Sequence, residues 1–179
     1  MRLCFLDIET RLLAAECPGG WADLLSGGGG MSVAATILEV DGDVQEVRFW
    51  DDSNPLDLAA YLEDADTVIG WNSDSFDLPI IAALCGRTLA LRGSYDLKSA
   101  LPRPIRLDAA AKGTLGEGKR GDAMDAPSLA RRGEWVKLID YCVADVTLLR
   151  RLFHFAQEHG IIRLENGALL EVRPWQRIN

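Results

Sequence analysis

Residues 2–10 read Arg2-Leu3-Cys4-Phe5-Leu6-Asp7-Ile8-Glu9-Thr10, an apolar run that ends in two acids. The alternating, largely apolar part of this stretch predicts a buried strand over residues 2–8. Residues i and i+2 of a strand project to the same face, so Asp7 and Glu9 point together and Ile8 points to the opposite face. Two neighbouring acids repel each other unless a cation lies between them. The pattern allows a metal site, although a lone Asp-x-Glu pair more often marks a strand reaching solvent.

The rest of the chain predicts a mixed α/β fold. Three further strand patterns cover residues 31–40, 44–50 and 67–71, and two more, at 161–164 and 168–172, form a C-terminal hairpin around Asn166-Gly167. Helices are expected from Pro55, over residues 78–85 and, most clearly, over residues 134–158. Glycine and proline break the remaining segments, so residues 11–30 predict a loop and residues 96–133 predict helical fragments. Three strands in a meander, followed by alternating strand and helix, indicate a mixed sheet with helices on both faces.

Length and composition indicate one soluble domain. The 179 residues carry a formal net charge of −8, which counts against binding duplex nucleic acid by charge alone. We expect a single domain over 1–179, with its core at about 1–160 and a hairpin extension over 161–179. The four scattered cysteines, the lack of a signal peptide and the lack of a membrane span predict a cytoplasmic protein with free thiols.

One segment of this acidic chain is basic. Between Leu97 and Lys137 there are nine basic and five acidic residues, a local excess of four positive charges. Such a band is compatible with a groove that follows a nucleic-acid backbone, although a solvated surface of mixed charge is the more frequent meaning.

Two more acids occupy positions where a site could form. Asp77 follows the predicted fourth strand, in a turn where α/β sheets commonly bind ligands, although an acid at a helix N-terminus is also favoured by the helix dipole. Tyr141 and Asp145 are four residues apart on the long helix, so they share one side of it. An acid at the edge of an apolar stripe can face a cleft between helix and sheet, and it can equally be an ordinary boundary residue.

Together these segments resemble a known family. Phe5-Leu6-Asp7-Ile8-Glu9-Thr10, Asn72-Ser73-Asp74-Ser75-Phe76-Asp77-Leu78-Pro79 and Tyr141-Cys142-Val143-Ala144-Asp145 resemble, in order, the three motifs of the DEDD (DnaQ-like) 3′→5′ exonucleases in their tyrosine form. Three shorter segments, Gly19-Gly20-Trp21, Tyr95-Asp96-Leu97 and Leu138-Ile139-Asp140-Tyr141-Cys142, resemble the bacterial YprB-like ribonuclease-H-like group. The resemblance extends from Arg2 to about Gly160.

The resemblance implies an RNase H-like fold and a two-metal nuclease. The implied metal ligands are four carboxylates, Asp7, Glu9, Asp77 and Asp145, which would hold two Mg²⁺ or Mn²⁺ ions about 4 Å apart. Tyr141 would orient the attacking water. The implied contacts to a single-stranded 3′ end come from Thr10, Trp71, Asn72, Phe76 and Lys119.

Three alternatives stay open at this stage. An endonuclease or resolvase on the same fold would also use clustered carboxylates, and a non-catalytic nucleic-acid-binding or adaptor module would keep the fold without turnover. A purely structural domain would carry the acids by chance. DNA and RNA substrates are not distinguished, and a protein partner could supply substrate selection.

Overall fold

A five-stranded mixed sheet forms the centre of the protein. The computed structural model describes residues 1–118 and 126–176. The sheet has the order β3-β2-β1-β4-β5. Its strands are β1 (Arg2–Thr10), β2 (Met31–Val40), β3 (Asp43–Trp50), β4 (Thr67–Gly70) and β5 (Ser94–Asp96). β1, β2 and β3 form an antiparallel meander, β4 pairs in parallel with β1, and β5 pairs in parallel with β4.

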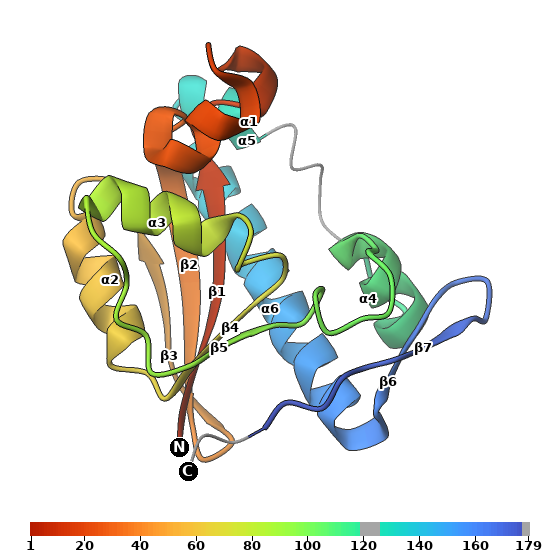
Figure 1. The fold of residues 1–179 in the computed structure, drawn as a ribbon. Coiled ribbons are helices and arrows are strands. Elements are labelled where there is room, and N and C mark those ends of the chain that lie inside the picture. The colour runs from red at the N-terminus through yellow and green to blue at the C-terminus, as the bar shows by residue number, and fades with distance from the viewer. Residues whose placement is uncertain (119–125, 177–179) are drawn as a thin grey trace.

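Helices cover both faces of the sheet, as the sequence predicted (Figure 1). One face packs against α2 (Pro55–Glu63) and α3 (Asp77–Cys85), and its core contains Cys4, Leu6 and Ile8 of β1. The other face packs against α4 (Leu107–Leu115), α5 (Ala126–Arg131) and the long α6 (Trp135–His159). The alternation of β1 therefore directs Leu3 and Phe5 toward α6, and the same side continues at Asp7 and Glu9.

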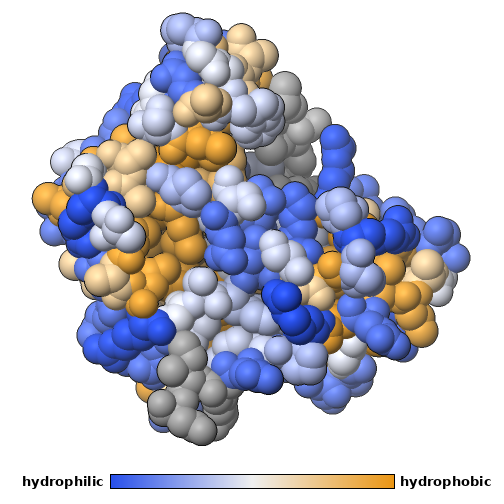
Figure 2. Space-filling view, viewed as in Figure 1, coloured by the Kyte–Doolittle hydropathy of each residue, from blue (hydrophilic) through white to orange (hydrophobic). Residues whose placement is uncertain are grey.

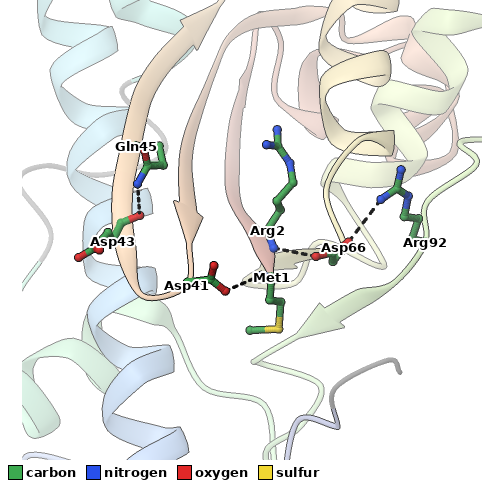
Figure 3. A network of polar contacts seen from close by, with 7 residues as sticks. All are labelled: Met1, Arg2, Asp41, Asp43, Gln45, Asp66 and Arg92. Carbon is green, nitrogen blue, oxygen red and sulfur yellow. Dashed lines mark hydrogen bonds and ion pairs between the residues drawn. The ribbon is translucent and has the colours of Figure 1, made fainter.

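The N-terminal end of β1 is fixed by a polar network far along the strand from its acids (Figure 3). The amino group of Met1 contacts Asp41 at 2.6 Å, in the turn that joins β2 and β3. The backbone N–H of Arg2 donates to Asp66 at 2.7 Å, and Arg92 contacts the same carboxylate. Asp41 and Gly42 both have positive φ values, which matches the right-handed twist of a tight hairpin.

Several sequence-based boundaries were wrong. Residues 11–30 contain short helical segments rather than only loop: η1 (Ala14–Glu16), α1 (Gly20–Asp23) and η2 (Leu24–Gly28). Leu24 is buried there, and a buried apolar anchor lets a glycine-rich segment keep helical turns. β5 was also missed, because three residues are too short for a period-two pattern to be recognised.

The C-terminal hairpin consists of β6 (Ile161–Arg163) and β7 (Leu169–Glu171), around the predicted Asn166-Gly167 turn. Its buried residues Ile162, Leu170 and Val172 belong to the core cluster on the α6 side of the sheet. None of the helices in residues 1–118 and 126–176 combines the length and apolar character that crossing a membrane requires.

α4 and the hairpin approach each other closely at Gly113. A Cβ on this residue would overlap the backbone of Arg163 and Leu164. We therefore expect Gly113→Ala to destabilise the protein by about 1–3 kcal/mol, the usual cost of overpacking against a backbone that cannot move away. Urea unfolding measures this value, and an unchanged or raised stability would contradict the close approach.

Candidate active site

Asp7, Glu9 and Asp145 come together in space from two elements. Asp7 and Glu9 lie at the end of β1, and Asp145 lies in the middle of α6. Each offers a carboxylate oxygen, and these three oxygens all lie within 4.8 Å of one another. The grouping follows from the sheet register, because β1 turns its odd-numbered side chains toward the helix that carries Asp145.

The group lies in a shielded position. The exposed fraction is 8% for Glu9 and 0% for Asp145, and Asp7 is half-buried. Carboxylates removed from water are costly unless they are paired, hydrogen-bonded or bound to a metal. Burial, and then the negative charges of Asp7 and Glu9, raise the pKa of the adjacent Cys142 thiol well above its ordinary value. Cys142 is thus a neutral donor whose Sγ lies 3.5 Å from Asp7 Oδ2.

Asp77 lies beside this group and outside the set of three. It is the first residue of α3 and is buried, and its Oδ1 accepts a hydrogen bond of 3.0 Å from the backbone N–H of Ile8. β4 pairs with β1 only as far as Phe5, so the backbone of β1 has no strand neighbour on that side at Ile8. The Asp77 carboxylate takes the place of that missing strand and connects α3 to the backbone between Asp7 and Glu9.

Tyr141 and several of the residues expected to contact nucleic acid are buried, or make contacts within the protein. Tyr141 is buried one helical turn before Asp145. The Thr10 hydroxyl donates to the carbonyl oxygen of Leu12 at 2.7 Å. Trp71 is half-buried against the α6-side core, and Phe76 is half-buried against the opposite core with its ring 6.5 Å from that of Trp21. Lys119 lies outside the described residues.

Asn72 belongs to a polar cluster that sequence reasoning missed. Buried Asp96, at the end of β5, accepts hydrogen bonds from the backbone N–H groups of Asn72, Lys98 and Ser99. Lys98 Nζ in turn donates to Asn72 Oδ1 at 2.9 Å. Asn72 has a φ of 70°, in the left-handed region that asparagine tolerates better than most residues. Tyr95-Asp96-Leu97 was noted as a motif, but the pattern did not indicate that Asp96 organises the ends of two strands.

The sheet order, the mixture of antiparallel and parallel pairing and the helices on both faces define an RNase H-like α/β fold. Two solved structures share it. A family B DNA polymerase from the hyperthermophilic archaeon Pyrobaculum calidifontis aligns with a TM-score of 0.56 and 17% identity, over 86% of this chain and 24% of the polymerase chain.

E. coli ExoI, in the zinc-ion-bound form of its complex with single-stranded DNA, aligns with a TM-score of 0.51 and 16% identity. This match covers 88% of the present chain and 43% of the ExoI chain, so the chain spans less than half of either structure. No family model matches the sequence, and no curated protein matches it. At 16% and 17% sequence identity, the similarity to these two structures establishes the fold and nothing further.

The donor set of the acidic group fits a hard divalent cation. All three of its ligand atoms are carboxylate oxygens, the atoms that Mg²⁺ and Mn²⁺ prefer. Two of the three residues are buried, which reduces competition from bulk water. The group Asp7, Glu9 and Asp145, called the carboxylate cluster below, is therefore a candidate metal centre.

Proposed function

We propose that this protein is a metal-dependent nuclease that removes nucleotides from the 3′ end of single-stranded DNA or RNA. The observation that carries the proposal is the convergence of Asp7, Glu9 and Asp145 within 4.8 Å. The order of the three motifs along the chain and the fold shared with a DNA polymerase and with a DNA-bound ExoI support it.

In this proposal Asp7, Glu9 and Asp145 would hold the Mg²⁺ or Mn²⁺ ions through their carboxylate oxygens. Asp77, whose carboxylate accepts a hydrogen bond from the backbone N–H of Ile8, would be the fourth carboxylate that helps to hold the ions. When bound, the ions would supply Lewis-acid stabilisation of the charge that develops on the phosphate oxygens. Because the carboxylates of the cluster are largely shielded from solvent, electrostatic interactions in the site are stronger than they would be in water.

Tyr141 is proposed to position the attacking water. Its place one turn before Asp145 puts both side chains on the same side of α6. We expect Tyr141→Phe to lower kcat roughly 10- to 100-fold, because a hydrogen bond to a charged partner is worth about 1.5–3 kcal/mol. KM should change little, since the hydroxyl acts on the water and not on the bound strand. An unchanged kcat, measured in initial-rate assays, would remove Tyr141 from this role.

The contacts to the terminal nucleotide are proposed to come from the strand ends around the cluster. The backbone at Thr10 and the side chain of Asn72 would contact the terminal nucleotide, and Trp71 or Phe76 would stack on a base. Lys119 would contact a phosphate. A protein partner that selects the substrate is compatible with this arrangement.

A gel time course on end-labelled oligonucleotides tests the reaction type. Single-stranded DNA and RNA, each labelled at the 5′ or the 3′ end, would be incubated with Mg²⁺, Mn²⁺ or EDTA, beside Asp7→Ala as the matched inactive variant. We expect a ladder that shortens one nucleotide at a time from the 3′ end, only with metal and only with the wild type. Internal cuts would identify an endonuclease, and binding without any cleavage would identify an adaptor module.

A further inference from the structure

Most cations in the described part of the chain are neutralised by a carboxylate, and a few are not. Eleven lysine and arginine residues of residues 1–118 and 126–176 form an ion pair with an aspartate or glutamate: Arg2, Arg11, Arg48, Arg87, Arg92, Lys112, Arg131, Arg132, Lys137, Arg150 and Arg151. Five have no such partner among the described residues, namely Lys98, Arg103, Arg106, Arg163 and Arg173, and the first three of these lie within nine residues of one another. Residues 97–107 contain no acidic residue at all.

The loop that carries these cations is fixed in place. Leu97, Leu101 and Leu107 are buried in the α6-side core, and the carbonyl oxygen of Ala100 accepts a hydrogen bond from the backbone N–H of Arg173. Arg103 and Arg106 are exposed between these anchors, and Lys98 is half-buried. The apolar residues thus hold the loop to the core while the cations face solvent.

The loop begins at the edge of the sheet where the carboxylate cluster also lies. β1, β4 and β5 are parallel, so their carboxyl ends lie at one edge of the sheet, and β1 and β5 are about 10 Å apart because β4 lies between them. Lys98 is the second residue after β5, and its hydrogen bond to Asn72 connects it to the turn that follows β4. From there the chain runs toward α4 in front of α6 (Figure 1). Hydrophilic residues dominate the middle of this face, between α3 and α4 (Figure 2).

We propose that Lys98, Arg103 and Arg106, called the basic track, bind consecutive phosphates of the strand that leads into the carboxylate cluster. The inference rests on the proposed nuclease function and deepens it, because it gives the path of the single strand away from the reacting end. Cations that have no carboxylate partner within residues 1–118 and 126–176 suit a polyanion, and they give this segment a local positive charge on an acidic chain. The phosphodiester backbone, rather than the bases, is the recognised group.

The salt dependence of binding tests the basic track. The affinity for 5′-fluorescein-labelled dT15 would be measured by anisotropy in EDTA between 50 and 200 mM KCl, conditions that separate binding from cleavage. Each phosphate contact contributes about 0.7 to the slope of log K against log salt for a single strand. We expect the triple variant Lys98→Gln/Arg103→Gln/Arg106→Gln to reduce the magnitude of this negative slope by about 2. A fourfold rise in salt should then cost the wild type about 20-fold more affinity than it costs the variant.

The matched control removes the same charge from paired positions. Arg48→Gln/Arg87→Gln/Arg92→Gln takes away three cations that already contact Glu46, Glu63 and Asp66, and its slope should equal that of the wild type. An equal fall in both triple variants would show that net charge alone matters and would overturn the track. Arg103→Gln alone, at an exposed loop position, should lower the slope by about 0.7 if the triple variant does not fold.

Failure of the track and failure of the nuclease proposal give different results. If the wild type cleaves dT15 with metal and the slope of the track variant is unchanged, the nuclease proposal stands and the track is wrong. If the slope falls as expected and no cleavage occurs with any metal, the track stands and the nuclease proposal is wrong. A wild type that does not bind dT15 at 50 mM KCl contradicts the track outright.

Discussion

Asp145→Asn is expected to lower the rate of cleavage by about a thousandfold or more. The substitution keeps the size of the side chain and removes its charge at a position that is fully buried on α6. A carboxylate ligand that is lost from a catalytic metal site removes several kcal/mol of transition-state stabilisation, and each 1.36 kcal/mol is a factor of ten in rate. Single-turnover cleavage of a 5′-labelled oligonucleotide in Mn²⁺ measures the loss.

Asp74→Asn is the matched control for this variant. Asp74 is an exposed acid in the turn before α3, three residues before Asp77, so its loss changes the net charge by the same amount. We expect its cleavage rate to remain near that of the wild type. If Asp145→Asn kept a rate within a few-fold of the wild type, the carboxylate cluster would not be the centre of the reaction.

Addition of Mn²⁺ is expected to stabilise the folded protein substantially. A ligand that binds only the native state at a concentration of 100 times its Kd contributes about 2.7 kcal/mol. For a chain of this size that corresponds to a rise in Tm of roughly 5–10 °C. The physical cause is that Asp7, Glu9 and Asp145 repel one another within 4.8 Å and a divalent cation between them reverses the sign of that interaction.

The repulsion among the three carboxylates also predicts two changes in the melting temperature of Asp145→Asn, one in EDTA and one in Mn²⁺. The variant should melt at a higher temperature than the wild type in EDTA, because one of three repelling charges is gone. Its Tm should then respond little to Mn²⁺. Calorimetric scans with and without metal check both values, and a wild-type Tm that is the same in EDTA and in excess Mn²⁺ would argue for a structural role of the three acids.

The sequence predicted the long elements of the fold, in which a regular hydrophobic period is repeated several times. The alternation of β1 was sufficient to place Asp7 and Glu9 on one face and Ile8 on the other, and the 3.6-residue period of α6 placed Tyr141 and Asp145 on one side. Alternation within one strand, however, does not say which helix covers which face. The grouping of Asp145 with the two β1 acids therefore followed from the motif resemblance and not from periodicity.

Other parts of the site depend on contacts that no local pattern encodes. β5 has three residues, and Asp96 at its end is important because it joins Asn72, Lys98 and Ser99, which only the folded chain brings together. The hydrogen bond from Ile8 to Asp77 arises because β4 ends earlier than β1, a difference in strand length that requires the sheet register. The basic excess between Leu97 and Lys137 was visible in the sequence, but the sequence did not show which of the cations in the described parts of this segment form ion pairs with carboxylates.

The most direct test of the proposed metal centre is the position of Mn²⁺ in a crystal of the wild-type protein, located by anomalous scattering. We expect an anomalous peak bounded by the carboxylates of Asp7, Glu9 and Asp145, and no peak there in crystals of Asp145→Asn grown in the same way. Well-ordered crystals in excess Mn²⁺ with no peak at the carboxylate cluster, or with ions only at exposed acids elsewhere, would contradict it.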